Sequence, residues 1–154
     1  MQKITVFLWF DTQAEEAMLF YTSLFKNSKR GKVTRYGEGG DTVLSATFEL
    51  DGKEYTAFNG GPHFSFTPAI SLFVSCESQG EVDEYWEKLS EGGDPDAQRC
   101  GWLKDKFGLS WQIIPTELMQ FLGHENPEIA KNVKAAMMKM KKIDIQTLKD
   151  ACQL

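Results

Sequence analysis

The chain contains the same short pattern twice, and this repeat limits the folds open to it. Residues 7–24 read FLWFDTQAEEAMLFYTSL, and residues 72–89 read LFVSCESQGEVDEYWEKL. In each copy an apolar run typical of a strand ends at a polar turn, and a helical pattern follows. The matched helical positions are Glu16 with Glu81, Phe20 with Tyr85, Tyr21 with Trp86 and Leu24 with Leu89. The repeat predicts two copies of one strand–turn–helix unit.

Both predicted helices begin with a capping signal. The first is expected over residues 13–25, with Thr12 as its N-cap and Glu15 three residues later. The second is expected over residues 79–90, and Ser78 stands at its N-cap position with a glutamate three residues on. The two units are therefore expected to enter their helices in the same way.

Strand and turn signals follow each helix. In the first copy, alternating residues predict strands at 32–36, 42–50 and 53–59, and Asp51-Gly52 is typical of a hairpin turn. The second copy is shorter, and its strands are predicted at 100–105 and 109–114. Each copy therefore indicates a βαβββ unit.

The predicted fold class is α+β, with two βαβββ units whose mixed sheets curl around a cavity. The units are expected at about 1–62 and 68–115, and together they form one paired domain over 1–115. Residues 116–154 are predicted to be a C-terminal helical extension of the same domain.

The extension shows three helical segments. A short helix is predicted over 116–122, and Asn126-Pro127 is a helix start signal. From there an apolar stripe runs from Ile129 to Ile143 at helical spacing, and Asp144 caps a last helix. The methionines near the end of the stripe are typical of core or dimer packing rather than of a metal or cofactor site.

Composition excludes several classes of protein. With 17 Lys and Arg against 22 Asp and Glu, the net charge is -5, which argues against a nucleic-acid partner. The apolar run at the N-terminus ends at Asp11, too early to span a bilayer, and no signal-peptide cleavage site follows it. Cys76, Cys100 and Cys152 form no Cys-x-x-Cys pair and are odd in number, as expected of reduced thiols. We therefore predict a cytoplasmic protein with no membrane or nucleic-acid partner.

Several motifs carry a family resemblance. They are Glu15-Glu16-Ala17 before Phe20-Tyr21, Gly60-Gly61-Pro62-x-Phe64-x-Phe66, Cys100-Gly101-Trp102-Leu103-Lys104-Asp105, Phe107-Gly108-Leu109-Ser110-Trp111-Gln112-Ile113 and Met140-Lys141-Lys142-Ile143-Asp144. The chain resembles the PhnB-like family of the vicinal oxygen chelate superfamily, whose members are described as 3-demethylubiquinone-9 3-methyltransferase-like. The resemblance implies a fold of the glyoxalase/bleomycin-resistance type and a homodimer, and it implies no particular reaction.

The residues do not favour methyl transfer. An adenosylmethionine site typically uses a glycine-rich turn after the first strand of a parallel sheet. Here the first strand ends Trp9-Phe10-Asp11-Thr12-Gln13, without a glycine.

A catalytic metal is not predicted either, nor is any other cofactor. Enzymes of the superfamily usually draw their metal ligands from the first and last strands of each unit, and they need three or four ligands that converge. The first strands, at 4–10 and 69–75, contain no His, Glu, Asp or Gln. Gln112 falls where the superfamily often has a ligating glutamate, but no partner for it is evident.

Two functions from different classes remain open. The favoured one is a metal-free homodimer that binds a small aromatic or amphipathic molecule. The alternative is a metal-dependent or Cys/His-assisted enzyme, resembling a glyoxalase or dioxygenase, that acts on a small oxygen-rich substrate. For the enzyme, the candidates are His63 as a base, Cys100 as a nucleophile and Gln112.

A pocket for a flat ligand would be built from aromatic and polar residues on the strands. The candidates are Trp9, Phe58, Ser71, Trp102, Trp111 and Gln112. For each aromatic residue the alternative is core packing. For His63 and Cys100 the alternatives are a loop histidine and a buried thiol.

Overall fold

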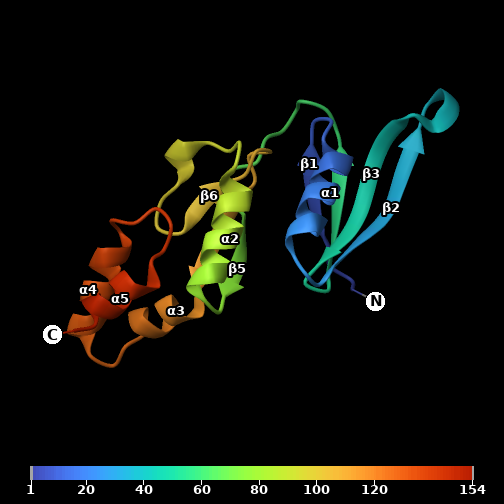
Figure 1. Cartoon of the computed structure of the whole chain (residues 1–154). Helices are drawn as coiled ribbons and strands as arrows, with labels where there is room; N and C mark the ends of the chain where they lie inside the picture. The colour runs from blue at the N-terminus through green and yellow to red at the C-terminus, as the bar shows by residue number, and fades with distance from the viewer. Residues whose placement is uncertain (1, 154) are drawn as a thin grey trace. The chain divides into compact units, whose positions relative to one another are not determined.

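Each copy of the repeat forms its own sheet in the computed structural model, which describes residues 2–153 (Figure 1). The chain divides into a first unit, residues 1–66, and a second unit, residues 67–154. Met1 and Leu154, which end the predicted ranges, lie outside the described residues. The predicted α+β class, with one mixed sheet and one crossover helix in each unit, is confirmed.

The first unit has the predicted βαβββ order. Its elements are β1 (Val6–Phe10), α1 (Ala14–Leu24), β2 (Ser28–Tyr36), the short 3₁₀ helix η1 (Glu38–Gly40), β3 (Thr42–Leu50) and β4 (Lys53–Asn59). The strand order is β1-β4-β3-β2, and only the β1–β4 pair is parallel. Asp51 and Gly52 have φ values of 50° and 75°, which suits the predicted two-residue hairpin turn.

Helix α1 covers one face of this sheet (Figure 1). Its apolar side chains recur at helical spacing, and four of them are buried: Ala14, Ala17, Met18 and Tyr21. Strand residues that alternate toward the helix, including Leu8 on β1 and Phe48 on β3, are buried with them. Among the described residues of this unit, no helix covers the other face of the sheet.

The predicted cap of α1 is wrong, because a side chain from another strand takes its place. Gln13 occupies the N-cap position and its side chain makes no capping bond. Instead Asn59 Oδ1 accepts a hydrogen bond from the Ala14 N–H at 2.8 Å, and Asn59 Nδ2 donates to the Val43 carbonyl at 3.2 Å. Asn59 can do this because it pairs with Phe10 in the parallel β1–β4 register, so it ends its strand beside the helix start.

The second unit is a shorter version of the first. Its elements are β5 (Ser71–Cys76), α2 (Gln79–Ser90), the 3₁₀ helix η2 (Pro95–Ala97), β6 (Trp102–Lys104) and β7 (Ser110–Pro115). The strand order is β5-β7-β6, and β5 runs parallel to β7. Helix α2 has its predicted bounds, and the Ser78 side chain accepts a hydrogen bond from the Glu81 N–H at 3.2 Å, as a cap should.

The strand predicted at 100–105 is shorter in the structure. Cys100 and Gly101 have φ values of 53° and 86°, in the left-handed region, so the chain turns there and β6 begins only at Trp102. In place of a fourth strand this unit has an isolated bridge between Arg99 and Trp102.

Three helices follow the second sheet: α3 (Thr116–Leu122), α4 (Pro127–Met137) and α5 (Ile145–Ala151). They gather at the C-terminal end of the second unit (Figure 1). Asn126 and Asp144 cap α4 and α5 as predicted, by accepting hydrogen bonds from the Glu128 N–H at 3.0 Å and the Thr147 N–H at 2.8 Å.

The predicted continuation of α4 to Ile143 is wrong. The helix ends at Met137, and the carbonyls of Met140 and Lys141 accept hydrogen bonds from the N–H groups of Cys100 and Gly101 at 2.9 and 2.8 Å. These two carbonyls therefore accept hydrogen bonds from the turn before β6 rather than from N–H groups of a longer α4.

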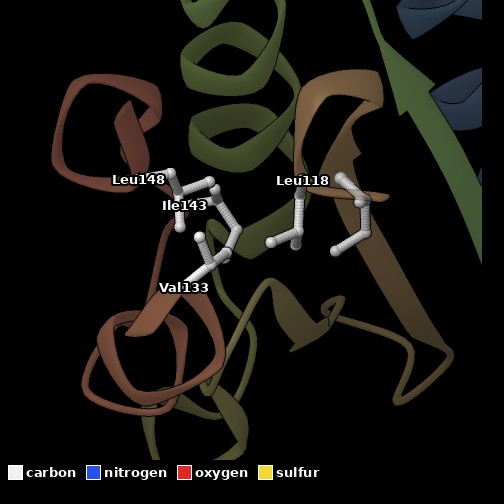
Figure 2. Close-up of a cluster of buried hydrophobic side chains, with 5 residues drawn as sticks. Leu118, Val133, Ile143 and Leu148 are labelled. Carbon is white, nitrogen blue, oxygen red and sulfur yellow. The ribbon is translucent and has the colours of Figure 1, made fainter. Parts of the chain in front are cut away.

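The three helices nevertheless share one core. Leu118, Val133, Ile143 and Leu148 converge from α3, α4, the following loop and α5, as Figure 2 shows, and Ile114 of β7 joins them. The Gln79 side chain ties this core to α2, because it donates to the Ile143 carbonyl at 3.0 Å and accepts from the Ile145 N–H at 2.8 Å. Among residues 2–153 no helix is long and apolar enough to cross a membrane.

We predict that Asn59→Ala lowers the free energy of unfolding by about 1–2 kcal/mol, because it removes the side chain that accepts the hydrogen bond of the Ala14 N–H at the α1 N-terminus. Urea unfolding followed by circular dichroism measures the change. Thr12→Ala is the matched control and should change the free energy by less than about 0.5 kcal/mol. A larger loss in Thr12→Ala than in Asn59→Ala would contradict the assignment of the cap.

Candidate functional site

The second sheet has one face buried under α2 and one face open. Side chains alternate along a strand, and the register pairs Ser71 with Ser110, Phe73 with Gln112, and Trp102 with Gln112. These five side chains therefore lie on the same face, opposite α2. The residues between them, including Trp111 and Ile113 on β7, are buried on the α2 face.

A cavity of about 690 Å³ lies over the open face. Its floor comes from the sheet and includes Phe73, Trp102, Ser110, Gln112 and Ile114. One wall comes from the C-terminal helices and consists of Leu118, Met119, Leu122, Met137 and Met138. The rest of the lining comes from the segment before β6 and from neighbouring positions: Pro68, Asp94, Asp96, Ala97, Arg99, Cys100, Leu103 and Lys104.

The polar groups of the cavity sit on a mainly apolar surface. On the floor, Gln112 Nε2 donates to Ser71 Oγ at 3.0 Å, which holds the amide in one plane. At the rim, Asp94 Oδ1 accepts a hydrogen bond from the Asp96 N–H at 2.9 Å. Two acids, Asp94 and Asp96, and two bases, Arg99 and Lys104, line the cavity, so their formal charges cancel.

The structure brings four of the predicted site residues together. Cys100, Trp102 and Gln112 line the cavity, and Ser71 is hydrogen-bonded to Gln112. Trp111 is not among the lining residues. It is 2% exposed on the α2 face, and its Nε1–H donates to Asp105 Oδ2 at 2.9 Å, so it is a core residue. Adjacent residues of a strand point to opposite faces of the sheet, so Gln112 lines the cavity whereas Trp111 is buried under α2.

The other predicted residues belong to the first unit. Trp9 and Phe58 are register partners on the face opposite α1, and their ring centroids lie 5.2 Å apart. Trp9 Nε1–H donates to the Gly61 carbonyl at 2.9 Å, and a Cβ on Gly60 would lie 2.2 Å from the Trp9 ring. The glycine is therefore required for this close approach. His63 is exposed in the loop that follows.

The three methionines of the cavity wall were not predicted from the sequence as binding residues. Met137 and Met138 were attributed to packing, and Met119 carried no signal beyond its place in a short amphipathic helix. The clustering of methionines at 137–140 was the sequence signal that could have predicted a binding surface, because this flexible thioether side chain is common at such surfaces. The position of Met138 depends on the turn after α4, which brings its Sδ to 3.8 Å from Cys100 Sγ, just before β6.

The three cysteines are free thiols in different settings. Cys76 is fully buried, and burial, followed by the negative charge of Glu81, raises the pKa of its thiol to about 12. Cys100 lines the cavity with its Sγ 3.8 Å from Met138 Sδ.

The donor set does not fit a metal centre of the superfamily type. On the open face, β5 and β7 offer the hydroxyls of Ser71, Ser75 and Ser110 and the Gln112 amide, without a carboxylate or an imidazole. A divalent metal in such a site needs three or four strong oxygen or nitrogen ligands. Throughout residues 2–153, no three His, Cys, Asp or Glu side chains are grouped so that they could hold a metal ion.

The Cys76 pKa predicts how stability changes in alkali. The folded state holds the thiol proton more tightly than the unfolded chain, whose thiol has a pKa of about 8.5. The contribution of Cys76 is therefore fully present below about pH 8.5 and is lost as the pH rises toward 12. Urea unfolding between these values should show a steeper fall in the free energy of unfolding for the wild type than for Cys76→Ala. Equal slopes for the wild type and Cys76→Ala would contradict the raised pKa of Cys76. The control is Cys152→Ala, which should fall as steeply as the wild type.

Residues 2–114 match the family model described as 3-demethylubiquinone-9 3-methyltransferase. A solved structure described as a putative 3-demethylubiquinone-9 3-methyltransferase, PhnB protein, from Bacillus cereus is 43% identical, with a TM-score of 0.66, and the match covers 75% of this chain and 100% of that chain. A protein from Staphylococcus aureus is 33% identical over 73% of this chain and 94% of its own, with a TM-score of 0.35.

Protein PA1353 from Pseudomonas aeruginosa is 17% identical with a TM-score of 0.60, over 75% of this chain and 98% of its own, and supports the fold alone. No curated protein matches the chain. The family match covers well over half of the chain, and the Bacillus cereus protein aligns along its whole length. The chain therefore belongs to the family described as 3-demethylubiquinone-9 3-methyltransferase, to which the PhnB protein of Bacillus cereus is similar over its whole length.

Proposed function

We propose that this protein binds a small aromatic or amphipathic molecule in the cavity of the second unit, without a catalytic metal. The cavity itself is the observation that carries the proposal. Its volume of about 690 Å³ lies within the range of about 300–1,000 Å³ typical of small-molecule sites. An indole, a phenyl ring and three thioethers line it, and such groups contact flat apolar ligands well.

The polar floor explains why the ligand is expected to be amphipathic. Gln112 and Ser110 provide hydrogen-bonding groups at one side of an otherwise apolar surface, so a ligand with one polar end gains orientation there. The cancelling charges of the lining residues give no preference for an anion or a cation. An uncharged aromatic probe is therefore suitable for a first test.

A second candidate is an enzyme that uses Cys100 on an oxygen-rich substrate. The observation in its favour is the position of Cys100, which lines the cavity with a φ of 53°, a backbone conformation that non-glycine residues adopt rarely. His63, the predicted base, belongs to the first unit. Turnover that disappears in Cys100→Ala and persists in Cys152→Ala would make this candidate the better one.

Methyl transfer, which the family description names, is not proposed. The segments after β1 and β5, Asp11-Thr12-Gln13 and Glu77-Ser78, lack the glycine-rich turn typical of adenosylmethionine sites.

We also propose that two copies associate, as the PhnB-like resemblance implies. In the first unit, Phe7 and Phe64 are 60% and 67% exposed, and their rings contact those of Phe58 and Trp9. Exposed aromatic side chains gathered in this way favour association. Light scattering of the untagged protein should give the mass of a dimer. A monomer mass at all accessible concentrations would refute this proposal.

We propose a cytoplasmic location, which three unpaired cysteines support because such thiols persist in reducing compartments. Cell fractionation with antibody detection tests it, and recovery in a secreted or periplasmic fraction would refute it.

The binding proposal predicts that N-phenylnaphthylamine, a neutral aromatic fluorophore, binds one to one with a saturable rise in fluorescence. Gln112→Trp, which fills the cavity floor, should weaken binding by about tenfold or more. The control is Glu87→Trp, which adds the same side chain at an exposed position of α2. Circular dichroism verifies folding of both variants.

Equal affinity in Gln112→Trp and Glu87→Trp would mean that the probe binds elsewhere, and the proposal would be rejected. Absence of saturable binding to the wild type would reject it as well.

A further inference from the structure

One wall of the cavity comes from outside the region that matches the family. The family match ends at residue 114, and α3 and the end of α4 lie beyond it. Five lining residues come from this extension: Leu118, Met119, Leu122, Met137 and Met138. We propose that residues 116–138 are the specificity element of the cavity, and that Met119 and Met138 select flat aromatic ligands by direct contact. This inference rests on the proposed binding function.

The wall is held in place by the core of the extension. Helix α3 begins directly after β7, so Ile114 at the strand end and Leu118 one turn later are buried in the same cluster (Figure 2). Val133 of α4, which is also fully buried, packs in that cluster. Since α3 and α4 share a core with the last strand of the sheet, their cavity-facing side chains are fixed relative to the floor.

Backbone contacts fix the other end of the wall. Met138 follows α4 directly, and two residues later the Met140 carbonyl accepts the Cys100 N–H at 2.9 Å. The Lys141 carbonyl accepts the Gly101 N–H at 2.8 Å. These bonds join the turn before β6 to the loop after α4, which places Met138 Sδ 3.8 Å from Cys100 Sγ at the cavity lining.

The two methionines are not needed for the core. Met119 is 58% exposed and Met138 is 45% exposed, whereas the apolar residues of the cluster are at most 4% exposed. Exposed apolar side chains that line a cavity have contact area to offer a ligand. Methionine is unbranched and polarisable, so it adapts to a ring and contacts it favourably.

The floor and the wall of the cavity differ in their relation to the family. The family model matches residues 2–114, which include the floor residues Phe73, Trp102, Ser110, Gln112 and Ile114. The wall residues follow the matched region, so the proposed selection of the ligand lies in a part of the chain that the family model does not describe.

The test measures affinity for N-phenylnaphthylamine in the full-length protein. Met119→Ala combined with Met138→Ala should weaken binding by about tenfold, because two thioether–ring contacts are lost. Met119→Leu combined with Met138→Leu retains most of the apolar area and should stay within about threefold of the wild type. Leu19→Ala is the control, because Leu19 is an exposed apolar residue of α1 that does not line the cavity.

The outcomes separate this inference from the proposed function. If the probe binds and Gln112→Trp blocks it, but the double alanine variant binds as tightly as Leu19→Ala, the cavity is a binding site and the wall inference is wrong. If the double alanine variant unfolds at a lower temperature than Leu19→Ala, single Met119→Ala and Met138→Ala variants replace it. Loss of affinity in neither single variant would then overturn the inference.

Discussion

The parallel pairing of the first and last strands of each unit is the constraint on which the rest of the structure depends. β1 pairs in parallel with β4, and β5 with β7. Parallel neighbours cannot be joined by a tight turn, so the chain leaves the first strand, forms a helix on one face and returns through antiparallel strands. The helix covers one face only. The side chains on the other face are not covered by that helix, and in the second unit they form the cavity floor.

The places where strands end decide which polar side chains stabilise the units. In the first unit, β4 ends beside the start of α1, so Asn59 bonds the first helical N–H. In the second unit, the turn between β6 and β7 is closed by Asp105, which is 2% exposed. Its carboxylate accepts hydrogen bonds from the N–H groups of Phe107 and Leu109 and from the Trp111 indole. A buried carboxylate with three donors is well compensated for the loss of water.

The C-terminal extension turns an open sheet face into a cavity. Its helices bury their own apolar stripes with Ile114, and Gln79 of α2 bonds to the backbone on both sides of Asp144. A salt bridge of 2.9 Å between Lys142 and Asp83 adds to this junction, and the hydrogen bond from Gln79, followed by Lys142, lowers the pKa of the Asp83 carboxyl. The extension therefore adds a wall to the sheet of the second unit, and the exposed wall residues Met119 and Met138 have little role in the core.

The sequence by itself determined the elements and the family. The repeat, the Asp51-Gly52 turn, the Ser78 cap and the bounds of α2 follow from spacing and turn chemistry, which depend on residues a few positions apart. The tryptophan and glycine motifs identified the family over most of its matched length. These features are local, and tertiary contacts did not change them.

The tertiary structure alone decided which residues share the candidate site. Trp102 and Trp111 have similar settings in the sequence, but the strand register turns one toward the cavity and buries the other. Asn59 replaced Thr12 as the cap, and the turn at Cys100-Gly101 ended α4 early, because each partner comes from a distant part of the chain. The same turn placed Met138 at the wall. Pairings between distant residues leave no periodic trace along the chain, so only the folded structure shows them.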